Sequence, residues 1–373
     1  MYAKRASVKN FRNIKEATVD FSPGVNVLVG ENAQGKTNLL EAIFYASVGR
    51  SFRAANASEM ISFGEKSAEI SVNYKRNERE RDDNITIKLF TDKKKTVEKN
   101  NLRVERMSEI VGSFRAVLFC PEHLSLIKAG PSERRNYLDI AISRISPSYI
   151  RSLQRYSYFL KQRNALIKTA YANRAVFDAT VELWSEKMAE EAAVISRMRL
   201  EFVRRVSSLV ESYFLEMTSE RERTEMVYKG NAGLEEDAYL DAQAVKKKYL
   251  ELLMSSHDRE IALGATQYGI HKDDTDIKIN GKSARIYASQ GQQRSLALAM
   301  KLAEGEICRE EFSDYPVFLF DDVLSELDDT RRDYMILHSV NKQVIISTCE
   351  SNFIKNMQAE KRILVKNGTY TEI

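Results

Sequence analysis

Long hydrophobic runs are missing from this chain of 373 residues. No apolar stretch approaches the roughly 18 residues that a membrane helix needs, and the first seven residues lack the apolar core of a signal peptide. Cysteine is also scarce, since only Cys120, Cys308 and Cys349 occur, scattered among apolar residues. We therefore expect a cytoplasmic protein with no membrane partner, whose thiols are reduced and buried.

Histidine and proline are scarce as well, and neither sign of charge is in large excess. The four histidines lie far apart, so no metal-ligand spacing exists, and five prolines without a Gly/Ser-rich tract argue against a flexible linker. The net charge of +4, from 57 basic and 53 acidic residues, is too mild for a histone-like binder. Any contact with nucleic acid must therefore come from local patches.

A phosphate-binding loop is the strongest motif in the chain. The valine-rich run Val25–Val29 predicts a buried parallel strand, and the residues after it fit the Walker A pattern G-x-x-x-x-G-K-[ST]. A helical pattern follows, so the positive end of that helix would face the phosphates. Lys36 would reach the β- and γ-phosphates and act in catalysis, while the Thr37 hydroxyl would bind Mg²⁺. The predicted ATP-binding residues are Gly30, Glu31, Asn32, Ala33, Gln34, Gly35, Lys36 and Thr37.

The last hundred residues contain the complementary motifs. Phe318–Phe320 predicts a buried Walker B strand, followed by Asp321, a candidate Mg²⁺ ligand, and Asp322, a candidate proton acceptor for the attacking water. The stretch Ser289–Gln293 predicts a glycine turn at a helix N-terminus, which suits phosphate binding. A second phosphate turn is redundant unless it serves another subunit's nucleotide. The candidate contacts in this turn are Ser289, Gly291 and Gln292.

Three basic segments carry less specific signals. Arg12, near the start of the fold, is a candidate phosphate contact or a polar loop residue, and Gly49–Arg53 either faces phosphate or caps the preceding helix. Lys93, Lys94 and Lys95 are predicted at a hairpin tip, where their ammonium groups would contact DNA or form an ordinary solvated turn.

The periodicity of the chain divides it into three segments. Residues 1–120 read as strands and the Walker A helix, including a β-rich arm, and residues 263–373 return to strands with an Asn280-Gly281 hairpin signal. Residues 121–262 are helical. A heptad there predicts a long helix in a coiled-coil-like pair, serving either as a clasping arm or as a subdomain core. The heptad positions are Val181, Met188, Ile195, Phe202 and Leu209.

The order of these motifs resembles that of ABC-type ATPases, in which two heads sandwich two ATP molecules. This resemblance implies an α/β fold: a P-loop ATPase head with a mixed sheet and a β-rich arm, into which the helical lobe is inserted. Within the class, the chain resembles the RecF family of bacterial recombination mediators over its full length. The matching segments are Asn10–Arg12, Gly30–Thr37, Gly49–Arg53, Pro121-Glu122, Gly130–Arg135, Gly269–Asp274, Ser289–Arg294 and Asp321-Asp322.

The RecF resemblance implies ATP, Mg²⁺ and DNA as ligands, with gaps and single/double-strand junctions as the DNA sites. It also implies an ATP-dependent homodimer, slow DNA-stimulated hydrolysis, cooperation with RecR and RecO in loading RecA, and a nucleoid-associated location. Ile270, Lys272 and Ser347 depart from the family pattern, which usually shows Pro, Arg and Thr there. Compared with transporter ATPases, Asp322 replaces a Glu and Thr348 replaces the switch His, which suits slow turnover.

Rival interpretations are weaker on specific features. A structural DNA-clamp ATPase of the SMC type, the main alternative, would carry hundreds of heptad residues between its head halves. A transporter ATPase would lack the helical lobe and the segment Gly269–Asp274, and a P-loop kinase has no use for Ser289–Arg294. A nuclease would need a separate acidic metal cluster.

Overall fold

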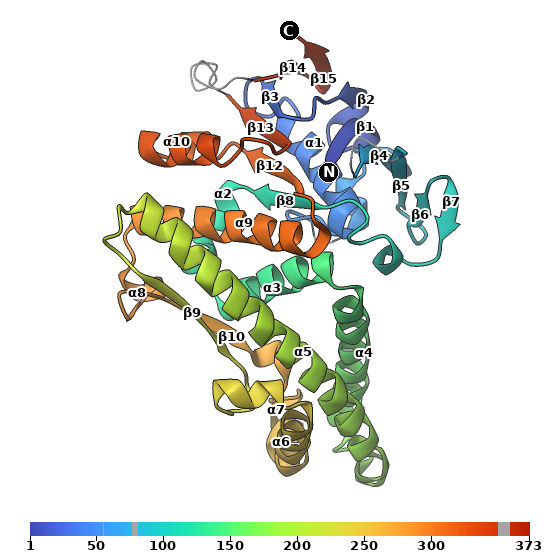
Figure 1. Ribbon diagram of the computed structural model, residues 1–373. Coiled ribbons are helices and arrows are strands. Elements are labelled where there is room, and N and C mark those ends of the chain that lie inside the picture. The colour runs from blue at the N-terminus through green and yellow to red at the C-terminus, as the bar shows by residue number, and fades with distance from the viewer. Residues whose placement is uncertain (55, 77–80, 350–358) are drawn as a thin grey trace. The chain divides into compact units, whose positions relative to one another are not determined.

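The computed structural model describes residues 1–54, 56–76, 81–349 and 359–373, which form two compact units. Unit 1 comprises Met1–Ser125, Tyr213–Arg221 and Ser289–Ile373, and unit 2 comprises Leu126–Ser212 and Glu222–Ala288. Figure 1 labels the elements along the chain. None of the helices in the described ranges is sufficiently long and apolar to span a bilayer.

Strands dominate unit 1. Its strands are β1 (Tyr2–Phe11), β2 (Ile14–Asp20), β3 (Val25–Val29), β4 (Ser67–Lys75), β5 (Asp83–Phe90), β6 (Thr96–Lys99), β7 (Leu102–Val104), β8 (Ala116–Phe119), β12 (Val317–Asp321), β13 (Val344–Thr348), β14 (Lys361–Lys366) and β15 (Thr369–Glu372). Its helices are α1 (Lys36–Val48), α2 (Pro121–Leu124), α9 (Gln290–Phe312) and α10 (Asp329–Leu337).

Helices dominate unit 2. They are α3 (Pro131–Ile145), α4 (Pro147–Thr169), α6 (Ala242–Ser255), α7 (His257–Leu263), α8 (Ala284–Tyr287) and most of α5 (Arg174–Met217), whose last residues belong to unit 1. The strands β9 (Thr224–Lys229), β10 (Asp274–Ile279) and β11 (Lys282–Ser283) form a three-stranded sheet.

The mainly parallel sheet of unit 1 has the order β15-β14-β3-β13-β12-β8. Its strands β12 and β13 are buried along their whole length, which explains their continuous apolar sequences. The expected strand Val25–Val29 is confirmed as β3 and the Walker B strand as β12, and β13 pairs with both. In register, Thr348 lies beside Val29 and Ser347 beside Asp321. The carboxyl ends of these three strands therefore meet at one edge of the sheet.

Apolar side chains of α9 and α10 cover one face of this sheet. Phe318 and Phe320 alternate with residues that point to the other face, and they pack with Leu298 and Leu302 of α9 and Met335 of α10. Helix α1 contacts strands of both large sheets, β8, β12 and β13 in one and β1, β4 and β5 in the other. The helix that follows the phosphate loop is therefore held between two sheets.

The second large sheet of unit 1 is antiparallel, in the order β2-β1-β4-β5-β6-β7, and it confirms the predicted β-rich arm. Its first two strands, β1 and β2, are separated by only two residues. The chain turns at Arg12-Asn13, where Arg12 has a φ of 55° and Phe11 pairs with Ile14. Because this turn is so short, pairing extends almost to it from both sides.

The heptad segment is confirmed as part of one long helix, the 44-residue α5. Val181, Met188, Ile195 and Phe202 are buried, whereas Leu209 is partly exposed. Near the connection between α4 and α5, Ile167 of α4 packs with Phe177 and Val181 of α5. The stripe thus fills the core of a helical unit, which was the second of the two interpretations of the heptad.

The compact units divide the chain differently from the expected segments 1–120, 121–262 and 263–373. Residues 263–288 fall in unit 2, because β10 pairs along its length with β9. The helical pattern of residues 121–262 did not predict the strand β9. The Asn280-Gly281 turn forms, with φ of 48° and 77°. Its second arm, however, is a two-residue strand, because the chain coils into α8 at Ala284.

Candidate nucleotide and DNA sites

The phosphate-binding loop connects β3 to α1. Ala33 and Gly35 have φ of 64° and 115°, so the loop turns sharply before the helix starts. A Cβ on Gly30 would lie 2.3 Å from the backbone oxygen of Val365, so that position accepts only glycine. These backbone constraints are those of a cradle whose N–H groups face inward to bind an anion.

Lys36 lies within this loop. Its Nζ donates hydrogen bonds to the backbone oxygens of Gly30 at 2.5 Å and Glu31 at 2.7 Å, and lies 3.4 Å from the Cys349 sulfur. Lys36 is buried, so its ammonium is fixed at the first turn of α1. Cys349 is partly exposed, which contradicts the expectation that all three thiols are buried.

A carboxylate and two hydroxyls meet beside the loop. The Thr37 Oγ1 and the Ser347 Oγ donate hydrogen bonds to the same oxygen of Asp321, at 2.9 and 2.7 Å. Burial raises the pKa of Asp321, while these two hydrogen bonds oppose the shift. Oxygen donors of this kind are what Mg²⁺ prefers. Ser347, a departure from the family pattern, supplies the hydroxyl that the position requires.

Asp322, the predicted proton acceptor, has an uncommon backbone conformation. Its φ is 50°, and its N–H lies 3.2 Å from the backbone oxygen of Ser347 and 3.0 Å from the Ser347 Oγ. Its own backbone oxygen accepts a hydrogen bond from Ser325. The conformation is therefore held by neighbours on both sides, as is common for strained residues at functional sites.

The C-terminal hairpin β14–β15 braces the loop, which the motif pattern did not reveal. Gln34 accepts hydrogen bonds from the backbone N–H groups of Asn367, at 2.6 Å, and Gly368, at 2.9 Å. The Tyr370 hydroxyl donates to the Gly35 oxygen at 2.9 Å. The roles of Gln34 and Tyr370 could not have been identified from the sequence, because no motif marks such residues as contacts between a loop and a distant hairpin.

Arg12, a candidate phosphate contact or polar loop residue, forms its hydrogen bonds with protein groups. Its guanidinium makes two hydrogen bonds to the buried carboxylate of Glu41 on α1, at 3.0 and 2.8 Å, and one to the Glu59 oxygen at 2.7 Å. Glu41 also bonds Ser51 and lies 3.8 Å from Arg53. The segment Gly49–Arg53 and Arg12 thus gather around one acid in the middle of the phosphate-loop helix.

The turn at Ser289 starts α9 as expected. Ser289 accepts a hydrogen bond from the Gln292 N–H at 3.2 Å, and its own N–H donates to the Gln292 side chain at 2.8 Å, forming a capping box. Gly291 lies against Arg331, whose guanidinium would be 3.2 Å from an added Cβ. Ser289 is exposed, so its hydroxyl is accessible from solvent while it caps the helix.

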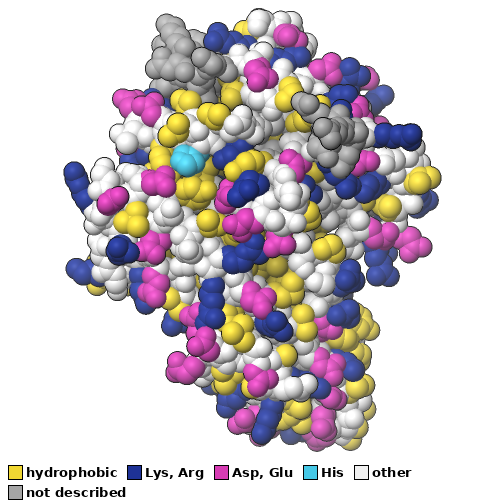
Figure 2. Space-filling model, in the orientation of Figure 1, with side chains coloured by type: hydrophobic (Ala, Val, Ile, Leu, Met, Phe, Trp, Pro, Cys, Tyr) yellow, Lys and Arg dark blue, Asp and Glu magenta, His cyan; other side chains and the backbone are white. Residues whose placement is uncertain are grey.

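The lysine run is confirmed at the tip between β5 and β6, but its members differ. Lys93 and Lys94 are exposed, whereas Lys95 turns inward and bonds the Tyr45 hydroxyl and the Gly49 oxygen. The predicted DNA contact of Lys95 stays a prediction, and in the structure its ammonium bonds to two groups of α1 and its C-cap. On the face drawn in Figure 2, basic and acidic side chains are mixed, so any DNA contact depends on local patches.

In unit 2, the segments Gly130–Arg135 and Gly269–Asp274 are bonded to each other. Arg134 pairs with Asp274 through two hydrogen bonds of 2.7 and 2.9 Å, and Arg135 donates to the Asp273 oxygen at 2.7 Å. The buried Asp273 also pairs with Arg199 of α5 at 3.0 Å. These two family segments therefore fasten α3 and α5 to β10, which is a structural role.

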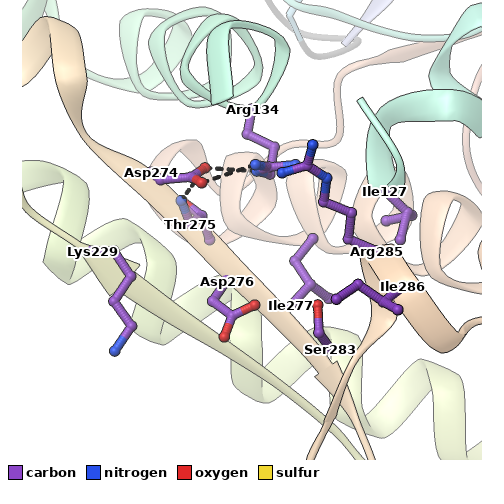
Figure 3. Close-up of a pocket in the computed structure, with 10 residues that line it drawn as sticks. All are labelled: Ile127, Arg134, Lys229, Asp274, Thr275, Asp276, Ile277, Ser283, Arg285 and Ile286. Atoms are coloured by element: carbon purple, nitrogen blue, oxygen red, sulfur yellow. Dashed lines mark hydrogen bonds and ion pairs between the residues drawn. The ribbon is translucent and has the colours of Figure 1, made fainter. Parts of the chain in front are cut away.

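A hollow of about 600 Å³ lies beside this junction in unit 2 (Figure 3). Arg134 and Asp274 form one wall, and Lys229, Arg285 and Ile286 line the rest with their neighbours. Neither this hollow nor any other part of the described ranges holds three or more His, Cys, Asp or Glu side chains placed to bind a metal. The Mg²⁺ prediction therefore depends on Thr37 and Asp321.

These features define an ABC-type ATPase head with an inserted helical lobe. A family model described as the RecF/RecN/SMC N terminal domain matches residues 2–371. The DNA replication and repair protein RecF of Ruminiclostridium cellulolyticum is 38% identical over 349 residues, covering 94% of this chain and 92% of that protein. The RecF protein of Bacillus mycoides is 35% identical over 373 residues, covering 99% and 98%. The chain belongs to the RecF family of DNA replication and repair proteins.

Solved structures agree with this assignment. The recombination mediator protein RecF-ATPrS of the RecFOR pathway superposes with a TM-score of 0.92 at 34% identity, covering 100% of this chain and 98% of that one. The RecF-ATP structure gives 0.90 at 34% identity, with coverages of 100% and 99%. An SMC head bound to the C-winged helix domain of ScpA gives 0.57 at 20% identity, covering 100% and 97%, which shows a shared fold.

Proposed function

We propose that this chain is an ATP-dependent DNA-binding protein of recombinational repair and replication-fork maintenance. It binds ATP with Mg²⁺, dimerises head to head on DNA gaps and single/double-strand junctions, and hydrolyses ATP slowly as a switch. With RecR and RecO it helps to load RecA, in the cytoplasm and in association with the nucleoid. Two groups of relatives that match nearly the whole chain support this role. The sequence relatives are named as DNA replication and repair proteins. The two solved structures are named as a recombination mediator with ATP and with ATPrS.

The observation that carries the proposal is the meeting of Lys36, Thr37 and Asp321 at one sheet edge. Bound Mg–ATP would supply the phosphate electrophile and a cation that neutralises its charge. Within the chain, Gly30–Thr37 would hold the phosphates through backbone N–H groups, and Lys36 would neutralise the β- and γ-phosphates. Thr37 and Asp321 would supply oxygen ligands to the metal. These two groups already lie together, since the Thr37 Oγ1 is 2.9 Å from an oxygen of the Asp321 carboxylate.

Hydrolysis and dimerisation follow from the remaining residues. Asp322 would accept the proton of the attacking water, held in place by its bonds to Ser347. Ser289, Gly291 and Gln292 would contact the nucleotide of a second subunit, because Ser289 is exposed at the N-terminus of the 23-residue α9. The clamp-type alternative loses support because α5 is the longest described helix and has 44 residues.

The experiment is Lys36→Met, studied by calorimetry and light scattering. We expect tight ATP binding to be lost, because the cation fixed in the phosphate loop disappears, and we expect no dimer with ATP and gapped DNA. Arg5→Met is the matched control, since Arg5 lies at the surface in a pair with Asp20. Unchanged ATP affinity in the Lys36 variant would refute the assignment of the site.

A further inference from the structure

A small basic surface surrounds the C-terminal end of the phosphate-loop helix. Arg50 follows Gly49, the C-cap of α1, while Lys93 and Lys94 lie in the loop between β5 and β6. All three side chains are exposed, and in the described part of the chain none of them forms an ion pair. Asp92 is the one acidic residue of the loop 91–95. The surface is therefore electropositive.

Lys95, the next residue, points in the opposite direction. Its Nζ donates hydrogen bonds to the Tyr45 hydroxyl at 2.9 Å and the Gly49 backbone oxygen at 3.0 Å, and lies 5.0 Å from the centre of the Tyr45 ring. The last turn of α1 has no basic residue of its own. Lys95 therefore supplies the cation that the negative end of this helix dipole attracts.

The position of Lys95 makes it sensitive to charge on the surface above it. Burial, and secondly the charge of Arg50, lower its pKa to about 8. At a pH near 8, where a group of this pKa is only about half protonated, an anion bound at Arg50, Lys93 and Lys94 would favour protonated Lys95, because opposite charges stabilise each other. Protonation strengthens a hydrogen bond to a carbonyl oxygen, so an occupied surface would tighten the contact with Gly49.

Helix α1 connects this contact to the nucleotide site. Its 13 residues run from Lys36 and Thr37, which face the predicted phosphates and Asp321, to the last turn that Lys95 contacts. Gly49, bonded by Lys95, is itself bonded to the helix through its N–H to the Tyr45 oxygen. A packed helix transmits a displacement of one end to the other, since it does not compress.

We propose that Arg50, Lys93 and Lys94 bind a nucleic-acid backbone and that Lys95 relays this binding through α1 to the phosphate loop. Lys95 is then a positioning residue for ATP hydrolysis and makes no contact with DNA. This inference rests on the proposed function and concerns the regulation of the same site. A nucleic-acid backbone is the occupant that fits, because three exposed cations outside any ion pair of the described residues match its phosphate charge, and the loop 91–95 has no apolar residue to anchor a peptide.

The test compares Lys95→Met with Lys94→Met, two neighbours that lose the same charge. Each protein is measured for DNA affinity across salt concentrations and for the ratio of ATP hydrolysis with saturating DNA to hydrolysis without it. Lys94→Met should weaken DNA binding and lower the salt slope by about 0.9, while saturating DNA still stimulates hydrolysis. Lys95→Met should keep DNA affinity and slope but lose the stimulation, and Lys95→Arg should restore part of it.

Each other outcome has a clear meaning. Stimulation of Lys95→Met to the wild-type ratio would overturn the relay, and loss of DNA affinity equal to that of Lys94→Met would make Lys95 a DNA contact. Polyglutamate that stimulates as DNA does would overturn the nucleic-acid assignment. Failure of the proposed function is distinguishable, because the wild-type protein would then neither bind ATP nor respond to DNA. Thermal unfolding of the Lys95 variants shows that they are folded.

Discussion

At the scale of single residues, the site depends on side chains and backbone angles that are fixed by their neighbours. Asp321 is held by two hydroxyls, and Asp322 takes a positive φ that few residues other than Gly, Asn and Asp accept. Burial raises the pKa of Asp321, and metal binding would favour its ionised form. The two adjacent acids are therefore placed in different environments, as their different predicted roles require.

Asp322→Asn tests the role of the second acid. Asparagine tolerates the same backbone conformation but accepts no proton, so we expect retained binding of ATP and Mg²⁺ and a hydrolysis rate lower by about 10²–10⁴. An ATP-bound dimer should persist in light scattering. Ser325→Ala, which removes the hydroxyl bonded to the Asp322 oxygen, is a control for local disturbance. A wild-type rate in Asp322→Asn would assign the proton acceptor to another residue.

The residues that could be predicted from the sequence are those whose position a local pattern determines. Lys36 and Thr37 follow from the loop that precedes them, and Asp321 from the strand that it ends. Arg12 and Lys95 could not be predicted, because their partners Glu41 and Tyr45 lie on a helix distant in sequence. A long basic side chain reaches several possible partners, and tertiary packing decides among them.

At the scale of elements, α9 shows how one residue serves two needs. Ser289 caps the helix through its hydroxyl and is exposed at the same time. The sequence predicted this helix start from the glycine turn Ser289–Gln293, and the capping box between Ser289 and Gln292 stabilises it. It did not predict the second arm of the Asn280-Gly281 turn, which coils into α8 because Ala284–Tyr287 favours a helix once pairing ends.

Ser289→Arg tests whether this turn completes another subunit's site. The added bulk and charge should prevent the heads from closing, so the dimer and DNA-stimulated hydrolysis should fail together while the monomer still binds ATP through Gly30–Thr37. Ser289→Asn is the matched control, because asparagine caps helices as well as serine does. Analytical ultracentrifugation with ATP measures the dimer.

Mixing the Ser289→Arg and Lys36→Met proteins sharpens the test. The mixed dimer retains one composite site, made of an intact Lys36 and an intact Ser289 from different subunits, so it should recover dimerisation that neither variant shows alone. If Ser289→Arg dimerises with ATP on its own, or loses ATP as a monomer, the two-headed mechanism is incorrect.

At the scale of the whole molecule, each unit has its own source of stability. Unit 1 relies on buried aliphatic strands, whereas unit 2 contains buried charges, including Arg163 paired with Glu260 and Arg199 paired with Asp273. The heptad predicted an apolar stripe on α5 but not the buried Arg199 on the same helix, because periodicity records only apolar positions. The division into units was mispredicted for residues 263–288 for a similar reason: β9 is one short strand among helices.

Acid should destabilise unit 2 through His271. Its Nδ1 lies 2.7 Å from the Tyr156 hydroxyl and its Nε2 lies 3.2 Å from the Thr266 oxygen, and burial lowers its pKa from 6.5 to about 4. The unfolded chain therefore binds more protons than the folded one between pH 6.5 and 4, so the free energy of unfolding falls as pH falls through this window. From pH 7 to 5 the loss is about 2 kcal/mol.

Urea unfolding at pH 7 and pH 5 measures this loss. His271→Gln should reduce it, because an amide offers a donor and an acceptor without titrating. Asp273, whose pKa burial raises, acts in the opposite direction at lower pH, and the variant leaves it in place. An identical pH dependence in both proteins would show that groups other than His271 cause the loss of stability between pH 7 and pH 5.

The bracing of Gln34 by Asn367 and Gly368 has a consequence for synthesis on the ribosome. Strand β3 is made early, but both of its neighbours, β13 and β14, come on the order of 300 residues later. At roughly 5–20 residues per second, β3 waits about 15–60 s for its partners. During that interval its backbone groups and apolar side chains have no native cover, so a nascent chain cannot hold nucleotide until its final hairpin has emerged.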